Sequence, residues 1–500
     1  MNKEKTTKII KYILCISILM IICLYKLIKT FDNDVFFDLK TGETLLKYGL
    51  DFKDHYSFIP NLTYLYHHYL YDLFLFFLYR KFSFTGIGIL FLIIFSLFGI
   101  ICFSVNKTYT KSYFWPLVIT IFTLLSSFQF FPYRVQAITN IIFFLEVFFL
   151  ERLYKTGEKK YIFLLIIGSI LTVNIHMPLW ILTIILTLPY LAEISAYYLS
   201  KKYNIFKKIK FEKPKNTKLF IIGISLLLLT GLISPFKLNP YTFFTKVMLN
   251  NDYNMIQEIA KPALYYSKYY IIIIIVYIFS AYFKIIKLSF RNLCLIMGLF
   301  FFGMMAIRNL AYSYLIIPTI YLYSVNKDIK LNSFSKVKVF ISKVNWNLIY
   351  LLLILFSGYV YMVLLNRVDY KNYDFQIKDM YPHKCVTYLK KHTDYKNIKI
   401  FNEFDYGSYI EFYDIPVFID SRAEVYSKKF NGGYDIIGDY KKIDHLEKWK
   451  ETFDKYDFDY AIVYFESNIE YSLKHDKNYK LVLEDSDAYA LYKKVEKNKS

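Results

Sequence analysis

The chain has 500 residues, of which 56% are hydrophobic and 21% aromatic, and its formal net charge is +21 at pH 7. The whole positive excess lies in residues 1–369, because residues 370–500 hold 22 Lys and Arg against 24 Asp and Glu. Lysines between long apolar runs are typical of cytoplasmic loops of membrane proteins, so this charge does not indicate a nucleic-acid surface, and five scattered cysteines exclude a disulfide framework.

The first predicted element is an apolar segment over residues 9–29, with four lysines before it and an acidic loop after it. It is long enough to cross a membrane, and no small-residue cleavage site follows before Asp32, so we expect an uncleaved anchor with a cytoplasmic N-terminus. Comparable runs recur up to about residue 365. They predict eleven transmembrane helices, over roughly 9–29, 85–105, 113–131, 136–153, 161–175, 178–199, 218–235, 264–284, 289–306, 309–325 and 346–365.

Basic loops orient these helices, since Lys and Arg accumulate on the cytoplasmic side. The loops expected there are 107–111, 155–160, 201–218, 284–291 and 327–343. The first loop, residues 30–84, is then external, and an odd number of crossings must separate it from the first basic loop. We therefore predict that the short apolar run over 66–79, which carries two histidines and an aspartate, is a helix lying on the outer membrane surface.

The first external loop concentrates the acids of this half of the chain. Residues 1–369 contain 17 Asp and Glu, and seven of them fall between positions 32 and 72. Three of these, Asp32, Asp34 and Asp38, follow directly on the first membrane segment, and acids at a membrane edge are commonly functional. We therefore expect the chemistry in this loop, the simpler alternative being a hydrated acidic cap on a helix end.

From about Tyr370 the long apolar runs stop, and residues 370–500 are predicted to form a small extracytoplasmic α/β domain. Expected strands are 398–402, 408–413, 416–420, 460–464, 479–484 and 488–493, and expected helices lie near 383–391, 445–455 and 467–475. Two polar clusters, 402–408 and 420–424, fall at predicted strand ends. They either meet an acceptor or form a salt-bridged turn that fixes the domain's own fold. The chain is thus expected to be a polytopic α-helical membrane protein, with a membrane domain over 1–369 and this domain after it.

A first membrane helix, an external loop with clustered Asp, a surface helix, about eleven spans and an external C-terminal domain resemble the GT-C glycosyltransferases, integral-membrane enzymes that use polyprenyl-phosphate-linked sugars. Short motifs are similar to a bacterial branch related to the protein mannosyltransferase and lipid A aminoarabinose transferase type: Asp34-Val-Phe-Phe-Asp-Leu-Lys-Thr-Gly-Glu43, Asp54-His-Tyr-Ser-Phe58, Asn174-Ile-His176 and Ile419-Asp-Ser-Arg-Ala-Glu424. The chain departs from that branch at Asp38, where His is expected, and at Tyr66, where Trp is expected.

The resemblance implies an inverting transfer of a sugar from a lipid phosphate to an acceptor hydroxyl, on the outer face of the cytoplasmic membrane. Such a reaction needs a carboxylate to take the hydroxyl proton and cations to hold the departing phosphate. Asp34 is the first candidate for the base, with Asp32 or Asp38 orienting it or binding a divalent cation. Carboxylate oxygens suit Mg²⁺ or Mn²⁺, which makes Asp34 and Asp38 the candidate ligands, although two or three carboxylates alone do not identify a metal site.

Arginine is scarce, with seven residues against 55 lysines, and it is the better bidentate partner for phosphate. Arg134 and Arg308 fall at predicted outer ends of spans and are candidates for binding the donor phosphate, with interfacial snorkelling as the alternative. His176 is a further candidate, the alternative being a helix-end histidine bonded to a backbone carbonyl. Candidate substrate or lid contacts are Glu43, Asp54, His67 and Glu258, and His67 and His68 could add metal ligands.

Other classes of function stay open. A transporter or flippase would show charges or Gly and Pro breaks at mid-span in paired segments, whereas the predicted spans are mostly closed apolar runs, with Glu146 and Glu193 as exceptions toward inner ends. A non-catalytic scaffold, or an O-antigen-type polymerase or ligase of cell-envelope glycans, is the other alternative. The partners expected for a transferase are a polyprenyl-phosphate sugar, membrane lipid and a glycan, lipid or protein acceptor.

Overall fold

The computed structural model describes residues 3–27, 33–203, 211–248, 257–325, 346–367, 378, 380–431, 433–485 and 488–495. The chain divides into two compact units, each built from segments that are distant in sequence. Unit 1 consists of Met1–Thr30, Gly88–Phe244 and Ile256–Val368. Unit 2 consists of Phe31–Ile87, Thr245–Met255 and Asp369–Ser500. The segment predicted as the first external loop therefore shares a unit with the C-terminal part of the chain.

Unit 1 is made of helices that follow the apolar runs of the sequence. Its helices are α1 (Lys3–Leu27), the second part of α3 (Tyr69–Lys107), α4 (Phe114–Ser127), α5 (Gln136–Thr156), α6 (Lys159–Ile175), α7 (Trp180–Ile185), α8 (Leu188–Tyr203), α9 (Thr217–Thr230), α11 (Leu264–Tyr282), α12 (Phe290–Met305), α13 (Leu310–Ser324) and α15 (Trp346–Arg367). Helix α10 (Asn239–Met248) crosses the division between the units. Short 3-10 turns are η1 (Phe128–Phe130), η2 (Met177–Leu179), η4 (Gln257–Ile259) and η5 (Ile307–Asn309).

Every range predicted as a span contains a helix. Three helical segments are long and apolar enough to cross a membrane: Lys5–Leu24, Tyr69–Lys107 and Met177–Tyr203. Shorter apolar helices lie at Phe114–Phe130, Thr217–Thr230, Tyr266–Tyr282, Phe290–Met305 and Tyr350–Leu364. The fold is therefore that of a helical protein with several membrane-length helices.

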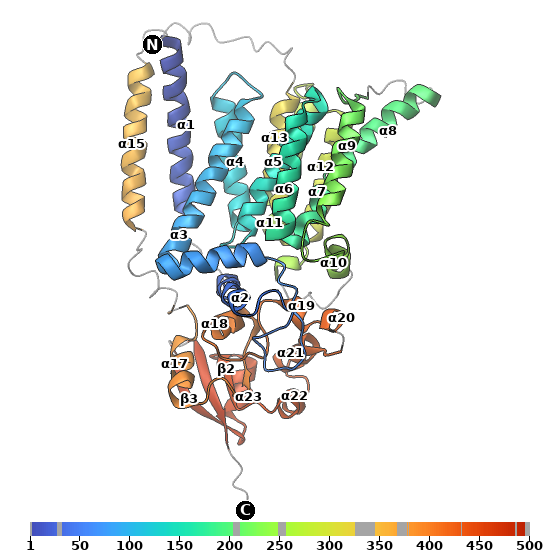
Figure 1. Ribbon diagram of the computed structural model, residues 1–500. Coiled ribbons are helices and arrows are strands. Elements are labelled where there is room, and N and C mark those ends of the chain that lie inside the picture. Colours follow the sequence, from blue (N-terminus) through green and yellow to red (C-terminus); the bar gives the residue numbers. More distant parts are fainter. Residues whose placement is uncertain are drawn as a thin grey trace, which may run out of the picture. The chain divides into compact units, whose positions relative to one another are not determined.

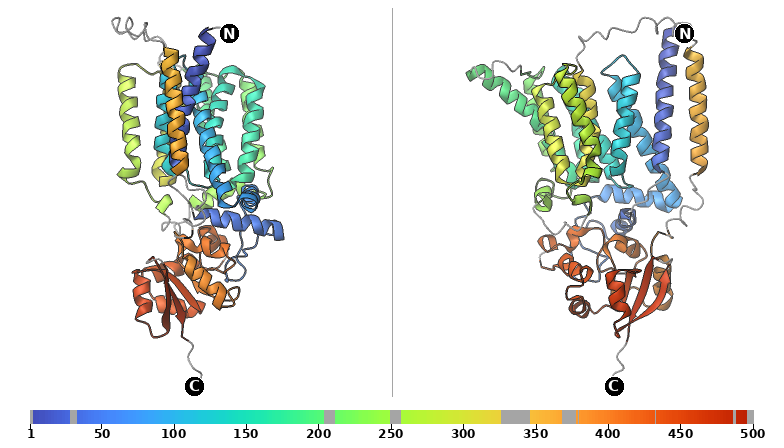
Figure 2. Two further views of the ribbon diagram at one scale, coloured as in Figure 1. Left: turned by 90° about the vertical axis from the view of Figure 1, so that its left-hand side faces the viewer. Right: turned by 180° about the vertical axis from the view of Figure 1, so that it is seen from behind.

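Helix α13 is the centre of unit 1. It contacts α4, α5, α11 and α12, and nearly all of its side chains are buried. Toward the edge, α1 and α15 pack side by side, as two views show (Figure 1, Figure 2), and the Ser357 hydroxyl donates to the Ser17 hydroxyl at 2.8 Å. The first and last helices of unit 1 are thus neighbours although more than three hundred residues separate them in sequence.

Helix α3 is interrupted at Ser83, whose backbone is not helical (φ 55°, ψ −160°). An unbroken helix of 39 residues would be about 58 Å long, roughly twice the thickness of a bilayer core. The interruption falls between the two apolar runs that the sequence separates at 66–79 and 85–105. It also falls close to the division between the units, which follows Ile87.

Unit 1 contains a buried ion cluster around Arg291, a residue in the first turn of α12 that is 2% exposed. Its guanidinium donates to both oxygens of Glu151 at 3.0 and 2.9 Å and to Glu193 at 2.7 Å, and these two carboxylates are also buried. It further bonds Glu212 at 2.8 Å, and the Tyr154 ring lies 4.5 Å from its central carbon. One arginine therefore ties α12 to α5, to α8 and to the segment before α9.

Unit 2 combines the N-terminal segment after α1 with the C-terminal part of the chain. The N-terminal segment supplies α2 (Asp34–Tyr48) and the start of α3. The C-terminal part supplies α17 (His383–His392), η6 (Phe404–Tyr406), α18 (Gly407–Phe412), α19 (Ala423–Tyr426), α20 (Lys428–Asn431), α21 (Ile436–Asp444), α22 (Trp449–Tyr456) and α23 (Asn468–Lys474). Helix α18 packs on α2, where Phe36 meets the rings of Tyr409 and Phe412.

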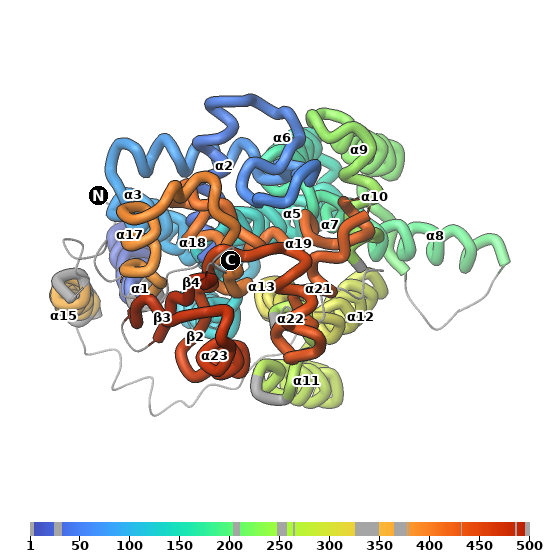
Figure 3. Tube along the Cα trace, turned by 90° about the horizontal axis from the view of Figure 1, so that it is seen from below, coloured from blue at the N-terminus to red at the C-terminus, as the bar shows by residue number. Residues whose placement is uncertain are grey.

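A small sheet completes unit 2. Its strands are β1 (Ile400–Phe401), β2 (Tyr460–Tyr464), β3 (Tyr479–Asp485) and β4 (Tyr489–Lys494), in the order β1-β2-β4-β3. Strands β1 and β2 are parallel, and the other pairs are antiparallel. Four consecutive residues of β2 are buried, as expected when both faces of a strand are covered. Helices α17 and α23 lie on opposite sides of the strands (Figure 3).

Two predicted strands are wrong. Residues 408–413 belong largely to helix α18, because Tyr409, Ile410 and Glu411 are all buried in succession, which a helix against α2 permits and an alternating strand does not. Residues 416–420 form no strand of the sheet; Val417 instead pairs with the N-terminal segment, its N–H donating to the Tyr56 carbonyl at 3.0 Å. The sequence pattern did not reveal that the partner of this segment lies 360 residues earlier.

The Arg291 cluster gives a first prediction. Arg291→Met leaves Glu151 and Glu193 buried without their cation, so we expect a loss of about 3 to 5 kcal/mol in the free energy of unfolding. Thermal unfolding of the detergent-purified protein measures this as a lower Tm. The matched control is Lys155→Met, which removes a half-exposed partner of Glu151 and should cost about 1 kcal/mol or less. Equal Tm values for the two variants would contradict the prediction.

Candidate functional site

The acidic segment after α1 folds into helix α2. Asp34 lies in its first turn and is partly exposed, whereas Asp38 lies one turn later on the same side and is 1% exposed. The five residues from Val35 to Leu39 are all buried, so this end of α2 is embedded in unit 2. Asp32 lies outside the described residues.

Gly42 sets how closely α2 approaches the start of α3. A Cβ atom at this position would lie 2.3 Å from the Asp72 carbonyl oxygen and 2.5 Å from the Phe76 Cβ atom. Contacts this short do not occur, so only glycine allows the two helices to cross here. The close crossing brings Asp38 of α2 next to the first turn of α3.

Three potential ligands converge at this crossing: Asp38, His68 and Asp72. One ligand atom from each lies within 4.8 Å of the other two, and the His68 Nδ1 atom is 3.7 Å from the Asp38 Oδ1 atom. All three side chains are buried. His68 and Asp72 are held at consecutive turns, since the Asp72 N–H donates to the His68 carbonyl at 3.0 Å. Asp34, the other predicted ligand, is not a member of this group.

His67 connects this group to the C-terminal part of unit 2. Its ring lies 4.2 Å from the His68 ring, nearly perpendicular to it, and its Nδ1 atom is 3.4 Å from Glu424 Oε1. Burial, followed by the neighbouring His68, lowers the pKa of His67 to about 3, so the ring is neutral at ordinary pH. His67, predicted as a substrate or lid contact, is thus buried between His68 and Glu424.

Arg422 of the 420–424 motif is the centre of a second buried ion cluster. Its guanidinium donates to both oxygens of Asp420, at 2.9 and 2.5 Å, and to Asp54 at 2.7 Å. Glu411 lies 3.5 Å away. The rings of Tyr56 and Tyr64 lie 4.3 and 4.8 Å from its central carbon. Asp54, predicted as a substrate or lid contact, is therefore an internal partner that joins the N-terminal segment to the C-terminal part of unit 2.

The cluster has three acidic side chains and one arginine, and the pKa values of Asp420 and Glu411 shift in opposite directions. Burial raises the pKa of Asp420, but Arg422 more than offsets this and the net shift is downward. Burial and then the charge of Asp420 raise the pKa of Glu411 well above its ordinary value. Glu411 is therefore the protonated member, which lets three acids share one guanidinium without an excess of buried charge.

The 402–408 cluster is internal as well. The Asn402 side chain donates to the Ile419 carbonyl at 2.6 Å and accepts from the Phe418 N–H at 2.9 Å. Gly407 lies so close to this segment that a Cβ atom would be 2.0 Å from the same Ile419 carbonyl. Both polar motifs of the C-terminal part thus fix the backbone around residues 418–422, which agrees with the alternative of a turn that stabilises the domain.

Within unit 1 the predicted phosphate-binding residues gather at one end of the helices. Arg134, just before α5, pairs with Glu258 of η4 at 3.3 Å, and η4 contacts η5, which carries Arg308. His176, at the end of α6, has its Nδ1 atom 3.1 Å from the Thr139 hydroxyl in the first turn of α5. Arg308 is exposed, whereas His176 is 4% exposed. Glu43 lies in unit 2, exposed, and pairs with Lys40 at 2.7 Å.

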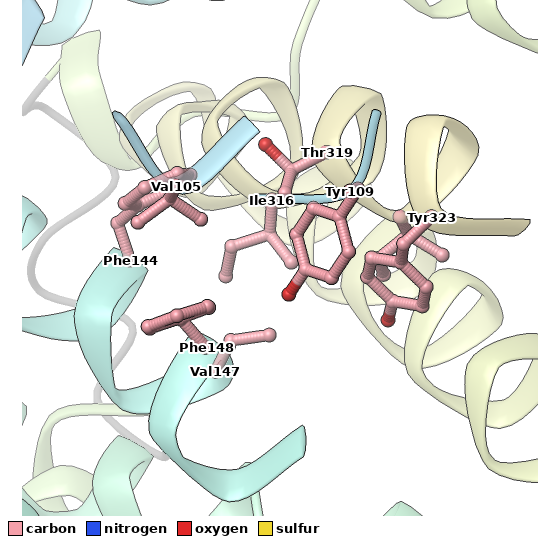
Figure 4. Close-up of a pocket in the computed structure, with 9 residues that line it drawn as sticks. Val105, Tyr109, Phe144, Val147, Phe148, Ile316, Thr319 and Tyr323 are labelled. Atoms are coloured by element: carbon pink, nitrogen blue, oxygen red, sulfur yellow. The ribbon is translucent and has the colours of Figure 1, made fainter. Parts of the chain in front are cut away.

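A small pocket between α3, α5 and α13 of unit 1 is a separate feature (Figure 4). Its lining is apolar except for Tyr109, Thr319 and Tyr323, and it contains none of the predicted site residues. Without a carboxylate or a basic side chain in its lining, this pocket offers no group for acid, base or phosphate chemistry.

Sequence reasoning assigned no role to Asp72 or Arg291, and it considered Arg422 only as a member of the 420–424 cluster. A single acid in an apolar run, such as Asp72, is usually found on the solvated face of an amphipathic helix. The structure instead buries Asp72, because α2 crosses α3 at Gly42. The sequence did contain a signal for the two arginines, namely the scarcity of arginine in this chain. In a chain with 55 lysines, a position that keeps Arg indicates a planar, bidentate contact, and this applies to both buried clusters.

The Arg422 cluster leads to a second prediction. Arg422→Met leaves Asp54 and Asp420 buried and unpaired, and we expect a loss of about 3 to 5 kcal/mol in the stability of unit 2. Limited proteolysis of the full-length protein should then cut within residues 33–87, where the wild type resists. Lys494→Met, which removes an exposed partner of Asp457 in the same unit, should leave the cleavage pattern unchanged.

A third prediction concerns pH. Burial, followed by the charges of Asp444 and Asp405, raises the pKa of Glu403 to about 7. The folded state then binds a proton that the unfolded state releases above its lower pKa, so stability falls as pH rises from about 4.5 to about 7. The loss is at most about 3 kcal/mol, reduced by the partial exposure of the side chain.

Glu403→Gln should flatten this fall in a series of Tm measurements from pH 5 to pH 7.5, whereas Glu451→Gln, an exposed control in the same unit, should follow the wild type. If the Tm of Glu403→Gln falls with pH as steeply as that of the wild type, other titrating groups cause the loss of stability.

Comparison of the chain with models of known protein families and with curated proteins finds no match.

Proposed function

We propose that this protein is a membrane glycosyltransferase of the GT-C type, with about eleven transmembrane helices and an extracytoplasmic unit 2. It moves a sugar from a polyprenyl-phosphate donor to an acceptor hydroxyl on the outer face of the cytoplasmic membrane. The placement of Asp34 carries the proposal. This partly exposed carboxylate begins α2 a few residues after the membrane-length helix α1 ends, and the lipid of such a donor stays in the bilayer.

In this proposal Asp34 is the general base. Its carboxylate accepts the proton of the acceptor hydroxyl while that oxygen forms a bond to the anomeric carbon of the sugar. The bond from the anomeric carbon to the phosphate oxygen breaks, polyprenyl phosphate leaves, and the configuration inverts. Asp38 is suited to positioning α2 and not to proton transfer with a substrate, because its side chain is 1% exposed.

The departing phosphate needs a cation. Arg308 is the first candidate, since its side chain is exposed at the end of unit 1 where α12 turns into α13. Arg134 is the second, although its guanidinium is already paired with Glu258. Arginine at these positions supports phosphate binding because its planar fork matches two phosphate oxygens.

Transfer activity tests the proposal and is a fourth prediction. Membranes that contain the wild type, Asp34→Asn or Asp51→Asn receive a panel of radiolabelled polyprenyl-phosphate sugars and host glycolipid extract. We expect the wild type to move label to a new product and Asp34→Asn to do so at least about a hundredfold more slowly, the usual contribution of a general base. Asp51 is an acid of the same segment paired with His55 near the surface, so Asp51→Asn should retain activity.

Two outcomes would count against the proposal once equal expression and equal Tm have been checked. Equal transfer by the wild type and Asp34→Asn would remove Asp34 from the mechanism. No transfer from any donor would contradict the transferase and favour a scaffold or transporter.

A further inference from the structure

We propose that Asp38, His68 and Asp72 form a binding site for a divalent transition-metal ion in unit 2. The site is independent of the transfer reaction, because it is inferred from geometry and charge and is tested by metal uptake. It also differs from the expected pair of Asp34 and Asp38, since it is made by one imidazole and two carboxylates from two crossing helices.

The spacing of the three side chains fits one ion. Bonds of about 2.1 Å place two ligands of a single ion roughly 3 to 4 Å apart. The His68 Nδ1 atom is 3.7 Å from the Asp38 Oδ1 atom, and all three ligand atoms lie within 4.8 Å of one another. Small rotations of the side chains bring the set to bonding distance.

The charge of the site favours a cation. Asp38 and Asp72 are adjacent carboxylates with 1% and 0% exposure. Within the described part of the chain, Asp72 pairs with no lysine or arginine, and its carboxyl lies against that of Asp38. An uncompensated buried carboxylate is costly, and a second one beside it raises the cost. A proton shared by the two acids leaves one negative charge beside His68, whereas a divalent ion bound by all three side chains neutralises both carboxylates.

The framework around the ligands is rigid, as a metal site needs. Gly42 fixes the crossing of α2 and α3 at the Asp72 carbonyl. The ring of His67 packs against the His68 ring, and Glu424 lies 3.4 Å from the His67 Nδ1 atom. Packing of this kind restrains the orientation of a ligating histidine.

The ligand types indicate which ions fit. An imidazole with two carboxylates suits Zn²⁺, Mn²⁺, Fe²⁺ or Co²⁺. Mg²⁺ prefers oxygen ligands and keeps several waters, which a fully buried site with an imidazole does not favour. We therefore expect first-row transition metals to bind and Mg²⁺ not to compete at equal concentration.

Cobalt uptake tests the site. The full-length protein, purified in detergent with an affinity tag that contains no histidine, is stripped with a chelator and titrated with Co²⁺. We expect one equivalent to bind with visible d–d absorption, Zn²⁺ to displace it, and Zn²⁺ to raise the Tm. Asp38→Asn, Asp72→Asn and His68→Gln should each weaken Co²⁺ binding at least tenfold and abolish the Tm increase.

The matched controls are His55→Gln and Asp51→Asn, a histidine and an aspartate of the same segment that pair with each other near the surface. Both should bind Co²⁺ as the wild type does. Stripped wild type that takes up no Co²⁺ would overturn the proposal and assign a shared proton to the two acids, whether or not the variants fold. Equal binding by wild type and the three ligand variants would overturn it as well, since the uptake would then be adventitious.

Discussion

The buried guanidinium of Arg422 is the contact on which the architecture of unit 2 depends. It is bonded to Asp54 in the N-terminal segment and to Asp420 in the C-terminal part, and two tyrosine rings cover it. Removing one partner from such a cluster leaves a charge in a low-dielectric interior, which is far more costly than the loss of a surface ion pair. The position of the whole segment over residues 51–72, including His67 and His68, therefore depends on a residue near the other end of the chain.

Both units contain buried acids that are paired with a single buried arginine. Arg291 in unit 1 and Arg422 in unit 2 each gather three carboxylates around one guanidinium, and each has tyrosine against its face. Lysine cannot replace either residue, because its ammonium does not present a planar array of donors. In this lysine-rich chain, arginine occurs at these two positions, where the guanidinium makes bidentate hydrogen bonds to a carboxylate. Several buried acids of residues 1–369 therefore have a structural role. An acid is a candidate for proton transfer with a substrate only where its side chain is accessible, as at Asp34.

The sequence predicted the helices well and the tertiary partners poorly. Long apolar runs predict a helix at each of the eleven ranges because length and hydropathy are local properties. The break at Ser83 lies between two such runs for the same reason. Residues 408–413 were predicted wrongly as a strand, since their alternation is a local pattern whereas their burial is set by contact with α2. Asp38, His67 and His68 were predicted as potential metal ligands, but Asp72 was not. The crossing of α2 over Asp72 at Gly42 is a tertiary contact that no local sequence pattern predicts.

The pairing of Asp54 with Arg422 spans 368 residues, and nearly all of unit 1 is encoded between them. During synthesis the N-terminal segment of unit 2 therefore exists long before the surface that covers it. Closing so long a loop is entropically slow, and Phe36 meets its C-terminal partners Tyr409 and Phe412 only when translation is almost complete. A chain truncated before residue 400 would contain every helix of unit 1 and still lack half the core of unit 2. Loss of the last hundred residues should therefore prevent unit 2 from folding even though every helix of unit 1 is present.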